Sequence, residues 1–111
     1  KEVIESNSVI LAAFGGEANL YCNFLLSREV LQVTWQKKNG SSFQNIATYS
    51  SRHGIRLIGP FQKKVNFTTA TPKVSAITLQ NLTFDDEAYY RCIFNVFSHG
   101  SFSKDILLNI Q

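Results

Sequence analysis

Two cysteines, two histidines and a run of three acidic residues are the side chains of this sequence that could carry out chemistry. The cysteines are Cys22 and Cys92, so at most one internal disulfide can form. His53 and His99 each lie in a glycine-flanked stretch, and no serine, cysteine and carboxylate motif accompanies them. This pattern favours solvent-exposed loop histidines and predicts a protein that is not an enzyme.

The acidic run is Asp85, Asp86 and Glu87. It could attract a cation, but a helical or turn-like entry to the following strand explains it more simply. Metal binding needs a denser set of His, Cys or carboxylate ligands than this chain offers, so we expect neither a metal nor a cofactor.

The charge balance argues against nucleic acid as a partner. The net charge of +3 comes from 11 basic and 8 acidic residues, and the basic ones are scattered apart from two lysine pairs at residues 37–38 and 63–64. A surface that follows a phosphate backbone usually needs a clustered stripe of Lys and Arg. Nor does any motif indicate a small-molecule substrate.

Three Asn-x-Ser/Thr acceptors for N-glycosylation occur, at Asn39, Asn66 and Asn81. Together they favour a secreted or cell-surface chain whose cysteines are oxidised. The longest apolar run, residues 9–14, is far shorter than the ~20 residues needed to cross a bilayer. We therefore expect a soluble segment. The mature ectodomain of a membrane protein would have the same sequence features.

The elements that must position these residues read as β-strands, because apolar residues recur mostly at every second position between Gly, Ser, Asn and Pro. In two segments the inward side chains are expected to be Ala18, Leu20, Cys22 and Phe24, and then Leu31, Val33 and Trp35. Strands are expected at residues 3–4, 9–13, 18–24, 31–37, 44–49, 55–58, 65–68, 75–79, 88–96 and 102–110. Glycine-containing turns at 38–42 and 98–101 suit hairpins. The sequence thus predicts one all-β domain over residues 1–111.

The spacing of Cys22, Trp35 and Cys92 resembles the immunoglobulin pattern, in which one disulfide joins two facing sheets and a tryptophan packs against it. In the loop-closure model such a crosslink contributes on the order of 4 kcal/mol to stability. The interval between the cysteines also has room for the two extra strands of a variable-type domain. We therefore expect a variable-type (V-set) immunoglobulin β-sandwich.

The stretch "DDEAYYRC" strengthens this resemblance, because it matches the signature Asp-x-Ala/Gly-x-Tyr-x-Cys from Asp86 to Cys92. Tyr90 stands two residues before Cys92, the position of the tyrosine corner, whose hydroxyl bonds back to the main chain. The resemblance further implies that Asp86 pairs with a basic residue at the bottom of the sandwich. Lys64 is the candidate partner.

The outward side of the strand at residues 88–96 is a candidate binding face. Alternation sends its odd-numbered side chains outward when Tyr90 and Cys92 point inward. Tyr and Arg are favoured anchors at protein interfaces, although scattered outward aromatics are also ordinary on any sheet. The candidate contact residues are Tyr89, Arg91, Ile93 and Asn95, with Thr34, Gln36 and Lys38 from the neighbouring strand, and Phe97 and His99 at the hairpin tip.

Three stretches, "VTWQKK", "NIATYSSRHG" and "CIFNVFSHG", resemble the amino-terminal domain of the OX-2 membrane glycoprotein family. The resemblance runs from about residue 18 to residue 111. Members are cell-surface ligands of an inhibitory receptor on myeloid cells, and some are encoded by large DNA viruses. The resemblance implies an extracellular, membrane-anchored protein whose candidate face binds an immunoglobulin-type receptor.

One departure from the family stands out. Members commonly carry a second cysteine pair, and the corresponding places here hold Tyr89 and Leu107. This indicates a divergent member, a paralogue or a viral homologue. Two alternatives share the fold: a nectin-like adhesion domain that pairs with itself, and an antigen-receptor variable domain. The second is disfavoured because "FSHGSFSKD" lacks the Phe/Trp-Gly-x-Gly bulge used for pairing.

Overall fold

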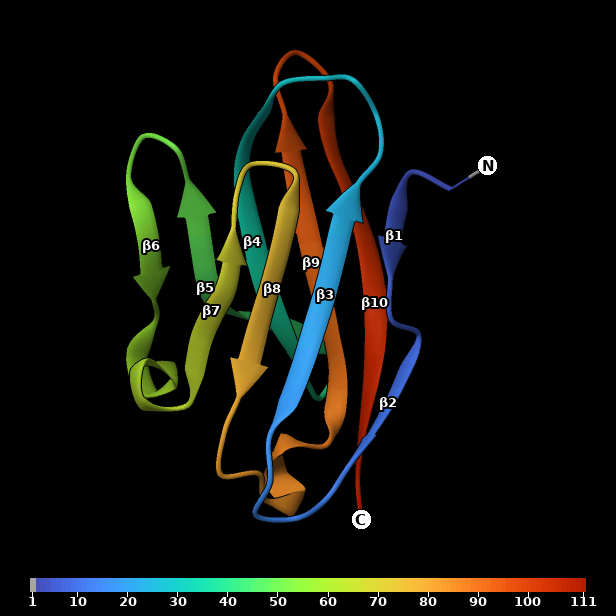
Figure 1. Cartoon of the computed structure of the whole chain (residues 1–111), viewed down its shortest axis with the longest axis vertical. Coiled ribbons are helices and arrows are strands. Elements are labelled where there is room, and N and C mark those ends of the chain that lie inside the picture. Colours follow the sequence, from blue (N-terminus) through green and yellow to red (C-terminus); the bar gives the residue numbers. More distant parts are fainter. Residues whose placement is uncertain (1) are drawn as a thin grey trace.

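The computed structural model describes residues 2–111, so Lys1, the first residue of the expected domain, lies outside it. These residues form two facing sheets with two short 3-10 helices (Figure 1). In spatial order, the four-stranded sheet contains β1 (Ile4–Ser6), β3 (Ala18–Phe24), β8 (Val74–Leu79) and β7 (Val65–Ala70). The six-stranded sheet contains β2 (Val9–Ala12), β10 (Gly100–Ile110), β9 (Ala88–Val96), β4 (Val30–Asn39), β5 (Ser42–Ser50) and β6 (Gly54–Leu57). The helices are η1 (Gly59–Lys63) and η2 (Phe84–Asp86), and no helix in residues 2–111 is long and apolar enough to span a membrane.

The core lies between the two sheets and follows the expected alternation. In β3, every second residue from Ala18 to Phe24 is buried, and β9 buries its even-numbered residues from Tyr90 to Val96. A disulfide between Cys22 of β3 and Cys92 of β9 joins the sheets. The predicted all-β sandwich with one disulfide between its sheets is therefore confirmed.

Trp35 is fully buried beside this crosslink, on β4 opposite Cys92 of β9. Its indole Nε1 donates a hydrogen bond of 2.9 Å to Ser75 Oγ on β8, in the facing sheet. The bond satisfies the indole N–H, the only polar group of this side chain. A buried N–H without an acceptor would cost free energy. Trp35 thus ties both sheets together by packing and by a hydrogen bond.

The expectation for Leu31 was wrong. The pairing of β4 with β9 shifts register between Val30 and Gln32, so the alternation that places Val33 inward does not extend back to Leu31. Val30 is buried instead and Leu31 is 49% exposed. A bulge of this kind moves every residue on one side of it to the opposite face.

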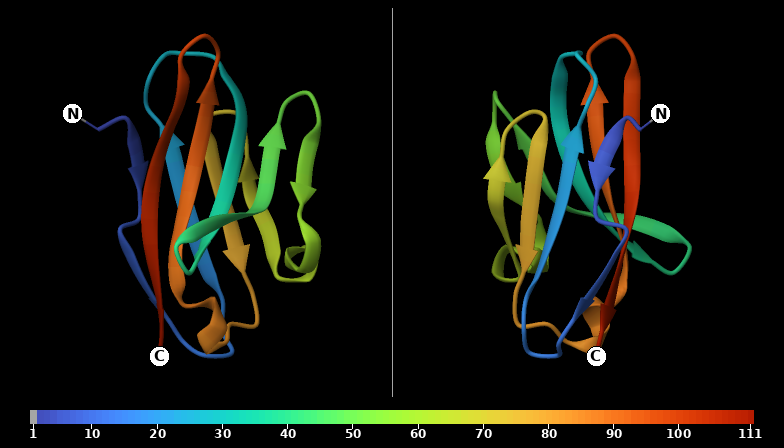
Figure 2. Two further views of the ribbon diagram at one scale, coloured as in Figure 1. Left: turned by 180° about the vertical axis from the view of Figure 1, so that it is seen from behind. Right: turned by 45° about the vertical axis from the view of Figure 1, so that its right-hand side comes forward.

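The edges of the six-stranded sheet differ. Strand β2 pairs with β10 in parallel, and β10 pairs with β9 without a register shift from Gly100 to Leu108. The continuous β9–β10 pairing agrees with the missing bulge motif of antigen-receptor variable domains. The other edge is β6. The hairpin between β4 and β5, two strands within the sheet, projects outward from the sandwich (Figure 2), beyond a register shift at Trp35 and Gln36.

Candidate binding face and its supporting corner

The acidic run supports the lower end of the sandwich. It forms η2, where a capping box links Thr83 and Asp86: Asp85 N donates to Thr83 Oγ1, and Thr83 N donates to Asp86 Oδ2. Tyr90 Oη donates to the main-chain oxygen of Asp86 at 2.6 Å, the bond of a tyrosine corner. This run therefore performs the turn-forming role that the sequence favoured over cation binding.

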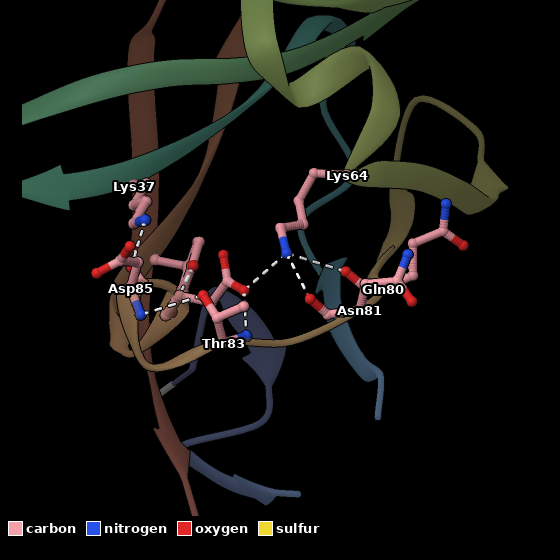
Figure 3. A network of polar contacts seen from close by, with 8 residues as sticks. Lys37, Lys64, Gln80, Asn81, Thr83 and Asp85 are labelled. Carbon is pink, nitrogen blue, oxygen red and sulfur yellow. Dashed lines mark hydrogen bonds and ion pairs between the residues drawn. The ribbon is translucent and has the colours of Figure 1, made fainter. Parts of the chain in front are cut away.

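Lys64 lies in the same corner (Figure 3). Its Nζ is 2.8 Å from Asp86 Oδ2 and also donates to the main-chain oxygens of Gln80 and Asn81. Asp86 is 4% exposed, so its charge is buried and compensated by Lys64 and by the Thr83 amide. The pair belongs to the structural frame and leaves the sheet face free.

Burial raises the pKa of the Tyr90 hydroxyl, and the nearby Asp86 carboxylate raises this pKa further. Both causes disfavour the deprotonated phenolate form of Tyr90, because its negative charge would be buried and would lie beside the carboxylate of Asp86. Tyr90 therefore remains a neutral hydrogen-bond donor in the folded domain.

The candidate face is the outward side of β9, β4 and β5. On β9, Tyr89 is 47% exposed, while Arg91, Ile93 and Asn95 are half-buried. The four side chains occupy one side of the strand, opposite the buried Tyr90 and its even-numbered successors. They form a continuous strip, and the exposed Tyr89 is at its lower end.

The β4 members of the face differ in accessibility, and the expectation that Thr34 offers contact surface was wrong. Thr34 is on the outward side but only 7% exposed, because it sits mid-sheet between Ile93 and Thr48, and Gln32 Nε2 donates to its hydroxyl. Gln36 Nε2 donates to Asn45 Oδ1 at 2.8 Å. Because its neighbours cover it, Thr34 lies beneath the surface of the face and offers little area for contact with a partner.

A cluster that sequence reasoning missed surrounds Arg91. Its Nε and Nη2 donate to the two carboxylate oxygens of Asp105 at 2.7 and 3.3 Å, and its guanidinium lies 3.8 Å from the ring centroid of Phe43. The Asp105 hydrogen bonds raise the pKa of Arg91. Lys38 Nζ approaches the same ring at 6.0 Å. The sequence signal was partial: Phe43 is a lone aromatic in a polar stretch and Asp105 alternates outward, but no local pattern joins either residue to Arg91.

The hairpin between β9 and β10 carries two more aromatic side chains. Phe97 is 60% exposed, and the exposed His99 stacks on Phe102 with ring centroids 5.2 Å apart. His53 is exposed in the turn between β5 and β6. Neither histidine belongs to a group of three or more candidate metal ligands within residues 2–111.

The three glycosylation acceptors lie at exposed positions. Asn66 is on β7 of the four-stranded sheet, Asn81 follows β8, and Asn39 ends β4 at the tip of the projecting hairpin. A glycan on Asn66 would therefore extend from the sheet opposite the candidate face.

Tyr89 and Leu107, the two positions at which the family resemblance implied a second cysteine pair, lie directly opposite each other on β9 and β10. Leu107 also pairs with Val9 of β2, which is exposed. An apolar row of Val9, Leu107 and Tyr89 thus extends from the lower end of the face across β10 to β2.

These features define the variable type of immunoglobulin sandwich, and the model of the "Immunoglobulin V-set domain" family matches residues 5–111. The chain belongs to this family. Residues of the chain are 38% identical over 93 positions to the human OX-2 membrane glycoprotein, and 37% identical over 95 positions to an OX-2 membrane glycoprotein homolog of Human herpesvirus 8. These matches cover 84% and 86% of the chain, but only 34% and 35% of the relatives. The chain thus spans about a third of the length of these relatives.

More distant matches follow. Nectin 1b of Danio rerio is 27% identical over 107 positions, covering 86% of this chain and 20% of that protein. The solved structure of murine CRIg superposes with a TM-score of 0.80 at 16% identity, covering 97% of this chain and 96% of that one. The structural match supports the fold alone.

Proposed function

We propose that this domain is the receptor-binding module of a cell-surface or virus-encoded ligand, and that it binds an inhibitory immunoglobulin-type receptor on myeloid cells. Its action is binding and not catalysis. The receptor is that of the OX-2 membrane glycoprotein, and engagement dampens immune activation. The domain lies outside the cell, and the full-length protein is anchored in the membrane.

The observation that carries this proposal is the outward strip of Tyr89, Arg91 and Ile93 in a chain similar to OX-2 membrane glycoprotein. Tyrosine and arginine are enriched among the residues that dominate interface energies. The cation–π contact with Phe43 holds the Arg91 guanidinium in one orientation, so little side-chain entropy would be lost on binding. The acceptor at Asn66 is on the other sheet, so a glycan there would not cover this face.

The test measures binding of the OX-2 receptor ectodomain to Arg91→Asp and Ile93→Asp by surface plasmon resonance. Each substitution should weaken binding by at least about tenfold, because a carboxylate would be desolvated at the centre of the interface. Unchanged affinity for both variants would exclude this face.

Two controls separate binding from folding. Tyr21→Asp makes a matched change at a half-buried outward residue of β3, on the opposite sheet, and should leave binding unchanged. Lys64→Ala should lower the free energy of unfolding by about 2 kcal/mol, since it leaves Asp86 buried without its cation, yet bind nearly as well as the wild type.

Homotypic adhesion is the second candidate function, and the match to Nectin 1b favours it. In that case the same sheet face would pair with a second copy of the chain. The apolar row of Val9, Leu107 and Tyr89 would then be buried between the two copies.

A further inference from the structure

The charges of this chain are divided between two parts of the sequence. Residues 30–84 contain seven Lys or Arg residues and no Asp or Glu, so all eight acidic residues lie outside this segment. The remaining residues hold eight acidic and four basic side chains. A net charge of +3 therefore conceals a strongly basic half and an acidic half.

The fold turns this division into an electrical asymmetry across the sandwich. The basic segment includes β5, β6, η1 and β7, which form one long edge of the molecule (Figure 1), with β6 ending one sheet and β7 ending the other. Strands β1, β2 and β10 lie at the opposite edge, where Glu5 is located and where the carboxylates of Glu2 and Asp105 are paired with Lys104 and Arg91. The excess charge therefore lies at the basic edge, where it can steer an acidic partner.

A hollow of about 480 Å³ opens at the basic edge, where β4, β5 and β6 run side by side. Its lining includes hydrogen-bond donors and one cation, which are Gln32, Thr48, Ser50, His53 and Arg56, and is completed by Gly54 and Ile58. The lining contains no carboxylate. Ser50 Oγ accepts a bond from His53 N, which leaves its own proton free to donate.

Arg56 is the charged group of this hollow, and it is available for a ligand. The ion pairs within residues 2–111 join Lys64 to Asp86, Arg91 to Asp105 and Lys104 to Glu2, and none includes Arg56. The guanidinium is exposed and carries five donors in a fork that matches a carboxylate.

The hollow is continuous with the candidate face. Ile93 pairs with Thr34, Thr34 with Thr48 and Thr48 with Arg56, so these four residues form one row across β9, β4, β5 and β6. Three strand spacings separate Ile93 from Arg56, or about 14 Å. A standard interface of ~800 Å² per partner is about 30 Å across and would cover both. The side chains of Thr34 and Thr48, which lie between them, are short, so the surface from Ile93 to Arg56 is flat.

We propose that the hollow receives an aspartate or glutamate side chain of the protein partner, so that the partner presents an acidic surface to the β5–β6 end of the face. This inference rests on the proposed function, because it assigns the hollow to the same interface as Ile93. The row geometry favours a protein over a free polyanion, since one flat partner spans the strip and the hollow together.

The experiment compares association kinetics of the OX-2 receptor ectodomain with wild type, Arg56→Glu and Arg56→Gln at two salt concentrations. Arg56→Glu should weaken binding about tenfold or more and Arg56→Gln by a smaller factor, and the association rate of wild type should depend more steeply on salt than that of Arg56→Glu. Arg28→Glu, in the exposed loop before β4, makes the same change in net charge and should bind within about twofold of wild type.

Each result has a distinct meaning. Binding of Arg56→Glu within about twofold of wild type would overturn the inference while leaving the proposed function intact. A wild-type domain that binds no receptor would reject the proposed function, and the inference with it. A heparin column that retains wild type but not Arg56→Glu, with receptor binding unchanged, would assign the hollow to a sulfated glycan and overturn the inference too. Arg56→Gln has the size of Arg56→Glu but removes the positive charge without reversing it, so the comparison survives if the charge reversal impairs folding.

Discussion

Tyr89 and Tyr90 are adjacent in the chain and serve opposite sides of β9. Tyr90 is fully buried and donates to Asp86 O at 2.6 Å, whereas Tyr89 is half exposed on the candidate face. The difference follows from the two-residue period of a strand. Chemically, Tyr90 is confined to its neutral form, and Tyr89 is free to contact a partner.

The raised pKa of Tyr90 predicts a loss of stability at alkaline pH. Above pH ~10 the unfolded chain releases the tyrosine proton while the folded domain retains it, so the unfolded state is favoured as pH rises. The free energy of unfolding should fall by up to about 1.4 kcal/mol per pH unit from this residue. Denaturant unfolding between pH 8 and pH 11 would measure this slope.

Tyr90→Phe is the matched control, because phenylalanine has no proton to release. This variant is expected to be less stable at neutral pH, since the bond to Asp86 O is lost, but its stability should decline less steeply above pH ~10. Equal slopes for the two proteins would show that Tyr90 titrates normally.

Residue roles were predictable from the sequence where a short motif determines them. Cys22, Cys92 and Trp35 lie where their spacing indicated. Thr34 was misjudged because alternation gives the side of a sheet to which a residue points but not how far its neighbours cover it. The contact of Arg91 with Phe43 joins residues far apart in sequence, and no local pattern encodes it.

At the scale of elements, the pairing of β9 with β10 places Tyr89 directly opposite Leu107. Opposed residues of antiparallel strands have Cα atoms about 4.5–5.5 Å apart, which lies within the range that a disulfide can bridge. Two cysteines at these positions would therefore lie close enough to form a crosslink between the strands.

Tyr89→Cys combined with Leu107→Cys should therefore form a second disulfide under oxidising conditions. The chain between them is short, so the loop-closure model expects a stabilisation of about 3 kcal/mol. Mass spectrometry would detect the bond, and thermal unfolding would give its effect on stability.

The appropriate comparison is Tyr89→Ser with Leu107→Ser, which removes the same apolar contacts without a crosslink. If the oxidised double-cysteine protein melts no higher than the double-serine protein, the β9–β10 pairing at this point is too far apart or too mobile to be bridged.

Element boundaries were predictable where alternation is uninterrupted. The expected strands at residues 18–24 and 88–96 coincide with β3 and β9. Prediction failed at Leu31, because the register shift in β4 depends on how this strand meets β9. A bulge is a property of two strands, so the pattern within one strand cannot disclose it.

At the scale of the molecule, the basic hollow suits a partner that presents an acidic surface. That partner could be a receptor or a second copy of the chain related by a twofold axis. Charge alone therefore does not separate the receptor ligand from the adhesion module.

Analytical ultracentrifugation of the purified domain at high concentration separates the two functions. A receptor ligand should sediment as a monomer of 12.5 kDa plus any glycan. A homodimer that Ile93→Asp dissociates would support adhesion through this face. A monomer that also fails to bind the receptor would exclude both functions.

The parallel pairing of β2 with β10 also determines how the domain bears force. Residues 9–12 pair with residues 107–110 in one direction, and Gln111 N donates to Ala12 O beyond them. Tension drawing the start of β2 and the end of β10 apart would pull the two strands in opposite directions along their length. Their hydrogen bonds would then be loaded in shear, all at once. We therefore expect the sandwich to resist unfolding when it is stretched along this axis.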